Sequence, residues 1–209
     1  MRFIMMLVSV LWLAGCAQPS ANDVAANALA TQQQDYVEGE DYRLLEQPIA
    51  NAPDVIELFF YGCRACYHLT DEISDWSAEQ GIQVNLVPAH SDTNLVEGAR
   101  MFHTFGVLNR LDLHVDGYVL FQEPSELQGE ERINALLAER GVDKDEFWAA
   151  WGGEAVNQRL AGSYQLTAMA GISSTPAFLV KGKYLVELGV IDGSEGLLNL
   201  LEYLVKQDA

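Results

Sequence analysis

The chain has 209 residues, of which 49% are hydrophobic, and it carries a net charge of −18. This length and apolar content suffice for one globular domain with a sizeable core and perhaps room for an insertion. The negative charge argues against nucleic acid as a partner, because phosphates bind basic surfaces, and against electrostatic docking on anionic lipid.

The first residues have the pattern of a secretory signal. Arg2 precedes an apolar run, Phe3 to Leu13, which is too short to span a bilayer and fits a signal peptide. The run ends in Leu13-Ala14-Gly15-Cys16, which resembles the lipobox of bacterial lipoproteins, where cleavage precedes a cysteine that is then lipidated. We therefore predict a lipoprotein signal peptide over residues 1–15 and a lipid anchor on Cys16. The alternative is an ordinary signal peptide that is cut near Ala17 and discards this cysteine.

Residues 16–38 are predicted to form a flexible tether, because they are mostly polar or small and lack a sustained apolar period. A coil of about 22 residues would reach about 25–30 Å, roughly one domain diameter. Ala17 stands where an Asp commonly retains lipoproteins at the inner membrane. The sequence therefore predicts a lipid-anchored protein on the periplasmic side of the cell envelope, at the outer membrane rather than the inner one.

The sequence Cys63-Arg64-Ala65-Cys66 lies between a β-rich apolar run, Val55 to Tyr61, and a helical pattern that continues to Gln80. Two thiols one helical turn apart can close and reopen a small disulfide ring. The unpaired N–H groups and the dipole at the helix N-terminus favour an anion, so they should lower the pKa of the first thiol. If Cys16 is lipidated, these two cysteines are the only ones left in the chain, which suits an oxidising compartment.

Other interpretations of the two cysteines fit less well. A structural disulfide in so small a ring would stabilise the fold little. A zinc site needs about four ligands, and the sequence holds no second Cys-x-x-Cys. Attachment of a c-type haem requires His directly after the second cysteine, where Tyr67 stands. The pattern favours redox chemistry, with no metal and no other cofactor.

The remaining elements follow in chain order. Short strands are predicted from Tyr42 to Leu45, from Val55 to Tyr61 with both faces buried, and from Ile82 to Pro88 after a C-cap at Gly81. A stretch from Asp92 to about Gly171 predicts four or five helices with breaks at Asn109-Arg110, Glu123-Pro124, Gly141 and Gly152-Gly153. A hairpin of Ala177 to Val180 and Lys183 to Val190, turning at Lys181-Gly182, precedes a last helix from Asp192 to Gln207.

Several short sequence motifs, in a fixed order along the chain, then indicate one family. They are Val55-Ile56-Glu57-Leu58-Phe59-Phe60 before the cysteine pair, Cys66-Tyr67, Gly141-Val142-Asp143-Lys144-Asp145-Glu146-Phe147, Gly171-Ile172, Thr175-Pro176-Ala177-Phe178 and Lys181-Gly182-Lys183-Tyr184. Over roughly residues 38–207 the chain resembles bacterial DsbA-type thiol-disulfide oxidoreductases of the thioredoxin-like superfamily, as a lipoprotein variant. This resemblance implies an α/β fold: a thioredoxin-like core of residues 39–91 and 172–209 with an inserted all-helical domain over 92–171.

The resemblance also implies roles for individual residues. Cys63 would be the nucleophile and Cys66 the buried resolving thiol, which exchange disulfides by thiolate attack on sulfur. Glu57, buried with a raised pKa, would shuttle a proton to Cys66; a solvated strand carboxylate is the alternative. Pro176 in cis would place the backbone of Thr175 beside Cys63, where a substrate peptide could pair with it; a trans proline at an edge strand is the alternative.

The predicted function is that of an envelope thiol-disulfide oxidoreductase, acting as an oxidase on cysteine-containing envelope proteins and recycled by a membrane redox partner. Arg64-Ala65 replaces the Pro-His typical of the family, and Thr175 replaces a frequent Val. These differences leave isomerase and reductase activities open. Two further alternatives are a tethered copper-binding module, since two thiolates suit Cu(I), and a structural lipoprotein with an inert disulfide.

Overall fold

The computed structural model describes residues 36–90, 95–188 and 193–207. Five strands within them form one sheet in the order β1-β5-β4-β2-β3. Strands β2 and β3 are parallel, and the other neighbouring strands are antiparallel. The strands are β1 (Arg43–Leu44), β2 (Val55–Phe59), β3 (Val84–Pro88), β4 (Ala177–Val180) and β5 (Tyr184–Glu187).

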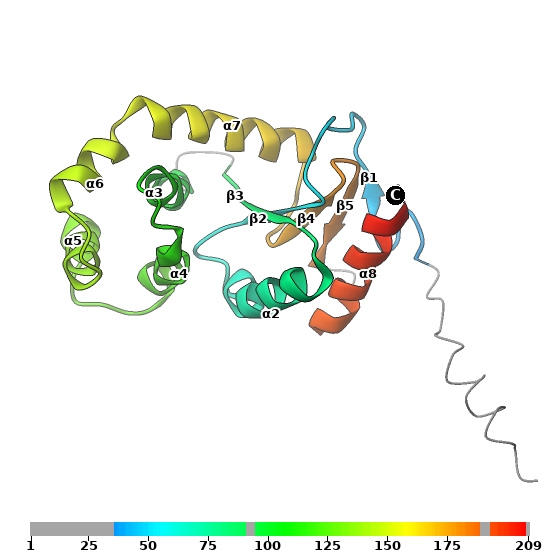
Figure 1. The fold of residues 1–209 in the computed structure, drawn as a ribbon, viewed down its shortest axis with the longest axis horizontal. Coiled ribbons are helices and arrows are strands. Elements are labelled where there is room, and N and C mark those ends of the chain that lie inside the picture. The colour runs from blue at the N-terminus through cyan, green and yellow to red at the C-terminus, as the bar shows by residue number, and fades with distance from the viewer. Residues whose placement is uncertain (1–35, 91–94, 189–192, 208–209) are drawn as a thin grey trace, which may run out of the picture. The chain divides into compact units, whose positions relative to one another are not determined.

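The helices fall into two groups (Figure 1). Two pack on the sheet, α2 (Arg64–Gln80) and α8 (Gly193–Gln207). The others form the helical insertion between β3 and β4: α3 (Val96–Val107), the short 3-10 helix η1 (Leu111–Leu113), α4 (His114–Gln122), α5 (Gly129–Glu139), α6 (Lys144–Trp151) and α7 (Glu154–Ala170). Among the described residues five α-helices occupy this insertion, and the helices break where the sequence predicted. A thioredoxin-like core with an all-helical insertion is therefore confirmed.

Each face of the sheet has its own apolar cluster, because side chains alternate along β2. On one face Val55 packs with apolar residues of α2 and α8, among them Ile73 and Leu201. On the other face Ile56 and Leu58 pack with Ala170 at the end of α7. All five residues of β2 are buried, as expected for a strand covered on both sides.

A third cluster joins the sheet to the helical insertion. Phe59 and Tyr61, at and just beyond the end of β2, pack with Cys66 of α2 and with residues of the insertion such as Phe102 and Tyr118. Cys63 and Cys66, which we call the redox pair, therefore lie where apolar side chains of the core pack against those of the insertion.

Four predicted strands are shorter in the structure. The strand expected to reach Tyr61 ends at Phe59, because Phe60 accepts a hydrogen bond from the backbone N–H of Cys63 and the chain turns there. The strand expected from Ile82 begins at Val84, because Ile82 is still bonded through its N–H to Ser77 at the end of α2.

The other two shorter strands are β1 and β5. The first strand spans Arg43–Leu44 rather than Tyr42 to Leu45, because Tyr42 instead forms an isolated bridge with Glu38. The strand predicted from Lys183 to Val190 spans Tyr184–Glu187, and residues 189–190 of that prediction lie outside the described residues. Lys183 belongs to the turn after Lys181 and Gly182, both of which have positive φ, as in primed hairpin turns.

The predicted signal peptide over 1–15, the lipidated Cys16 and most of the tether lie outside the described residues. Tyr36 packs its ring against Tyr203 of α8, with ring centres 5.0 Å apart. Packing against the core therefore includes a residue within the range 16–38 that the sequence assigned to the tether.

Candidate active site

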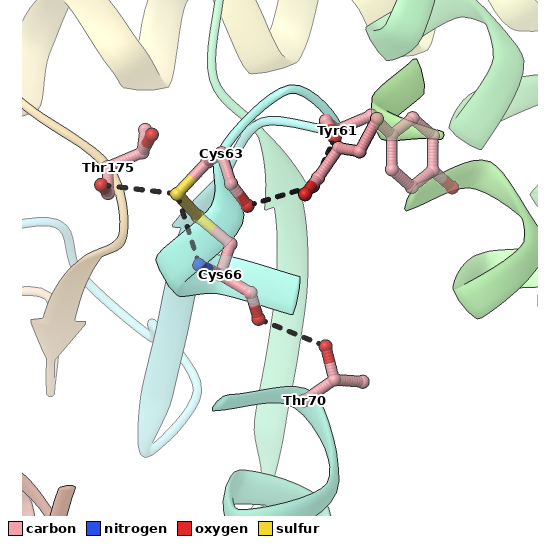
Figure 2. Close-up of a disulfide and its surroundings, with 6 residues drawn as sticks. Tyr61, Cys63, Cys66, Thr70 and Thr175 are labelled. Carbon is pink, nitrogen blue, oxygen red and sulfur yellow. Dashed lines mark hydrogen bonds between the residues drawn. A yellow bond between two sulfur atoms is a disulfide. The ribbon is translucent and has the colours of Figure 1, made fainter. Parts of the chain in front are cut away.

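The redox pair is a disulfide at the N-terminus of α2, with Cα atoms 5.3 Å apart (Figure 2). Cys63 is the N-cap of the helix, and its Sγ accepts a hydrogen bond from the backbone N–H of Cys66 at 3.1 Å. The first turn of a helix has N–H groups without intrahelical partners, and the helix dipole adds positive potential there. The same groups would stabilise a Cys63 thiolate once the disulfide is opened.

The two sulfurs differ in access. Cys63 is half-buried and Cys66 is fully buried. The intervening Arg64 and Ala65 are both exposed, so the dipeptide faces solvent above the pair. An incoming thiolate can therefore approach Cys63 and cannot approach Cys66 without a movement of the chain.

The loop before β4 brings a backbone carbonyl to the outer sulfur. The bond between Thr175 and Pro176 is cis, as the resemblance implies, and the Thr175 carbonyl oxygen lies 3.3 Å from Cys63 Sγ (Figure 2). A disulfide sulfur carries no proton, so in the oxidised pair this is a van der Waals contact. In the reduced protein the Cys63 thiol can donate a hydrogen bond to the same oxygen.

Glu57 lies in the middle of β2 and is 3% exposed. Burial raises its pKa to about 7, because the charged carboxylate loses its hydration there. The residue lines a cavity of about 350 Å³ together with Thr70, Ser74 of α2 and His114 of α4. The carboxyl therefore gains or loses a proton near neutral pH, on the side of β2 that faces α2.

Further polar groups gather around the buried end of the pair. Thr70 donates its hydroxyl to the Cys66 carbonyl oxygen at 3.1 Å (Figure 2). The hydroxyl of Tyr118 is fully buried and lies close to Thr70. Its pKa is raised, first by burial and then by the charge of Glu57. The charge state of Glu57 therefore affects the pKa of the buried Tyr118 hydroxyl.

His114 forms the far side of this region. One of its ring nitrogens, Nδ1, lies 3.2 Å from the Tyr61 hydroxyl, and burial lowers the pKa of the imidazole to about 4. The ring of Tyr61 points away from the disulfide (Figure 2). His114 is thus neutral at physiological pH and belongs to the packed interior.

The helical insertion holds the chain just before the pair. The Nε2 group of Gln122, at the end of α4, donates to the carbonyl oxygens of Tyr61 and Cys63 at 2.8 and 3.1 Å. No pattern in the sequence marked Gln122, Thr70 or Tyr118 as part of the site. Gln122 follows Cys63 by 59 residues, and nothing in its neighbourhood along the chain marks it.

The described residues can be compared with two other features, a metal-binding site and a membrane-spanning helix. Among them, no three His, Cys, Asp or Glu side chains are arranged to hold a metal ion. No helix in the same part of the chain is both long and apolar enough to cross a membrane.

Comparison with known proteins gives consistent matches over this region. The model of the family described as DSBA-like thioredoxin domain matches residues 41–205. A Pseudomonas aeruginosa relative named thiol:disulfide interchange protein DsbA is 29% identical over 188 residues, covering 86% of this chain and 89% of that protein. The crystal structure of Pseudomonas aeruginosa DsbA is similar with a TM-score of 0.75 at 27% identity, covering 84% of this chain and 96% of that one. The crystal structure of the oxidoreductase DsbA from Xylella fastidiosa is similar with a TM-score of 0.72 at 26% identity, covering 83% of this chain and 97% of that one.

Proposed function

This chain belongs to the DSBA-like thioredoxin domain family, and from that premise we propose that it oxidises cysteine pairs in other proteins with the disulfide of Cys63 and Cys66. As a member of this family it is a thiol-disulfide oxidoreductase. The observation that carries the proposal is the asymmetry of the redox pair. Cys63 is accessible and lies beside the Thr175 carbonyl, whereas Cys66 is fully buried.

The reaction balances over two exchange steps. A substrate thiolate attacks Cys63 Sγ, the bond between Cys63 and Cys66 breaks, and Cys66 leaves as a thiolate that takes up a proton. A second substrate thiolate then attacks the substrate sulfur of the mixed disulfide and releases Cys63. The substrate loses two electrons and two protons, and the redox pair gains the electrons. A membrane redox partner would accept them and restore the disulfide.

Glu57 is the residue we assign to the proton of Cys66. Its pKa of about 7 means that it holds a proton in a substantial fraction of molecules at neutral pH. A group with a pKa near the working pH transfers protons most effectively in both directions. Cys66 is buried and cannot exchange with bulk water directly, so a nearby acid and base is needed on this side.

Thr175 and Pro176 are assigned to substrate binding. The loop that carries them precedes β4, and its backbone lies beside the sulfur that forms the mixed disulfide. An extended substrate segment around the reacting cysteine could pair with the backbone of Thr175 as an added strand. Such pairing reads backbone groups, so it would accept many sequences.

The helix favours the oxidising direction. Donors at the N-terminus of α2 stabilise the Cys63 thiolate, which stabilises the reduced protein and makes its disulfide a better oxidant. Isomerase and reductase activities and a copper-binding role are less well supported. The exposed Arg64 adds positive charge near the pair, whereas Ala65 adds no donor.

Mixing the oxidised protein with a reduced peptide that carries two cysteines tests the proposal. The peptide should become lighter by two hydrogens while the protein gains two free thiols. A variant with both Cys63 and Cys66 replaced by serine is the control and should leave the peptide reduced. If the reduced protein opens peptide disulfides but the oxidised protein forms none, the activity is that of a reductase.

We further propose that the protein works in the periplasm, exported by the signal peptide over 1–15 and anchored by lipid on Cys16, with the outer membrane favoured. The sequence Leu13-Ala14-Gly15-Cys16 supports the anchor. Cys16→Ser should release the protein from the membrane fraction. Mass spectrometry that finds an unmodified N-terminus beyond Cys16 would contradict the anchor and leave the redox proposal untouched.

The domain boundaries remain part of the proposal. We assign residues 39–91 and 172–209 to the thioredoxin-like core and residues 92–171 to the helical insertion. The end of β3 at Pro88 and the start of β4 at Ala177 support this division.

A further inference from the structure

The loop that carries Thr175 is held by a carboxylate from the neighbouring strand. Oε1 of Glu187, the last residue of β5, accepts hydrogen bonds from the backbone N–H of Ser173 at 2.7 Å, the Ser173 hydroxyl at 2.8 Å and the backbone N–H of Ser174 at 3.1 Å. Glu187 also lies directly opposite Ala177 in the antiparallel pair of β4 and β5. One side chain therefore binds the two residues that immediately precede Thr175.

The segment just before this loop is held by an arginine from the edge strand β1. Nη2 of Arg43 donates to the carbonyl oxygens of Ala170 and Gly171 at 2.6 and 2.7 Å. These are carbonyls at the C-terminal end of α7, which have no intrahelical partner and carry the negative end of the helix dipole. Gly171 caps the helix with a φ of 56°. Figure 1 shows that α7 runs from the helical insertion to the sheet, so Arg43 fixes the point of return.

The two side chains also face each other. Nε of Arg43 lies 3.9 Å from Oε2 of Glu187, so Oε1 is free to accept the three loop hydrogen bonds. Residues 170–174 thus run along a two-residue clamp, Arg43 followed by Glu187, that ends one residue before Thr175. No motif in the sequence marked either residue.

We propose that Arg43 and Glu187 are positioning residues that set the Thr175 carbonyl against Cys63 for substrate pairing. This inference rests on the proposed function, since it assumes that a substrate segment pairs with the loop. Hydrogen bonds to a carboxylate are stronger and more directional than those between neutral groups. The side chain of Arg43 is 42% exposed and that of the partly buried Glu187 is 22% exposed, and an ion pair as long as 3.9 Å at such a site contributes little to folding. Their main effect is therefore on the geometry of the loop.

Peptide and small-molecule substrates separate geometry from general reactivity. A peptide has to pair with the loop, whereas dithiothreitol reaches Cys63 without it. Removal of the clamp should therefore raise KM for a peptide with two cysteines and leave the rate at which dithiothreitol reduces the disulfide nearly unchanged. Glu187→Leu should lower kcat/KM for the peptide about tenfold, mostly through KM.

Three further variants make the test specific. Glu187→Gln keeps an oxygen that accepts the N–H groups of Ser173 and Ser174, so it should recover most of the loss. Arg43→Met should give a smaller loss of the same kind, because it frees only the end of α7. Asp54→Leu is the matched control: Asp54 accepts from the Lys181 ammonium at 2.6 Å and lies before β2, at the end of the strand away from Cys63.

The outcomes are separable. If the wild-type protein does not oxidise the peptide, the proposed function itself is wrong. If the wild type is active and Glu187→Leu keeps its kcat/KM, the clamp does not position the loop. The inference also fails if Asp54→Leu loses as much peptide activity as Glu187→Leu, or if Glu187→Leu slows dithiothreitol as much as the peptide.

Discussion

The two sulfurs of the redox pair have opposite surroundings. The outer side, around Cys63, consists of exposed Arg64 and Ala65 and of two backbone groups, the N–H of Cys66 and the carbonyl of Thr175. The inner side, around Cys66, consists of the buried side chains Glu57, Tyr118 and His114, of which Glu57 gains or loses a proton near neutral pH. Backbone groups are present whatever the sequence, whereas buried ionisable side chains are specific choices. The outer side therefore suits broad substrate binding, and the inner side sets proton chemistry.

The largest effect should separate the two cysteines themselves. Cys66→Ser leaves the accessible sulfur of Cys63 without a resolving thiol, so the variant should accumulate mixed disulfides with substrate proteins. Cys63→Ser removes the accessible sulfur and should trap almost none, and both variants should lose turnover. Non-reducing electrophoresis and mass spectrometry measure the trapped species. Equal trapping by the two variants would remove the distinction between the outer and inner sides.

Glu57→Gln probes the inner side through stability. The pKa of Glu57 rises from its ordinary 4.5 to about 7 on folding, so between these values the folded protein binds more protons than the unfolded chain. The free energy of unfolding contributed by this group is therefore full below about pH 4.5 and is lost as pH rises through about 7. At pH 8 the glutamine variant should be more stable than the wild type by about 3 kcal/mol.

Urea denaturation at pH 5 and pH 8 measures this change. Near pH 5 the two proteins should differ much less, since Glu57 is then mostly protonated in the folded state. A variant that is equally stable with the wild type at pH 8 would show that the carboxylate is solvated. Peptide oxidation by the same variant should lose its dependence on a group that titrates near neutral pH.

His114→Gln tests the inner side in the acid direction. The pKa of His114 falls from its ordinary 6.5 to about 4 on folding, so the unfolded chain binds more protons between these values. Stability from this group is present above about pH 6.5 and is lost as pH falls through about 4. Between pH 7 and pH 4 the wild type should lose about 3 kcal/mol more than the glutamine variant. Parallel loss in both proteins would contradict the assignment.

Ala65→His probes the outer side and should have the smallest effect. A histidine here adds a donor to the Cys63 thiolate, so it should lower the pKa of that thiol and raise the reduction potential by about 30 mV or more. The wild type, without this donor, should lie below the ~−120 mV of DsbA and toward the ~−180 mV of protein disulfide isomerase. Equilibration with glutathione, read by mass, measures both proteins. A wild-type potential at or above that of DsbA would show that the helix and Arg64 supply the full stabilisation.

The parts of this molecule that a sequence pattern predicts are those with local causes. The apolar run of β2, the Cys-x-x-Cys spacing and the glycine C-cap at Gly81 each depend on neighbours within a few residues, and the structure has all three. The cis bond before Pro176 followed only from the family resemblance. Gln122, Glu187 and Arg43 depend on partners 59, 14 and 127 residues away along the chain. These hydrogen bonds form only after distant segments of the chain have packed together. No local sequence pattern therefore predicts them.

Gln122 has a consequence for anyone who edits this fold. It is the last residue of α4, inside the insertion, yet its amide bonds to the carbonyl oxygens of Tyr61 and Cys63 in the core. Deleting residues 92–171 to make a smaller enzyme would leave those two carbonyl oxygens without this hydrogen-bond donor. It would also expose Phe59 and Cys66 to solvent. Grafting the Cys-x-x-Cys helix onto another scaffold would meet the same problem. A graft would have to carry the redox pair together with α4. The helical insertion therefore supplies part of the support for the redox pair.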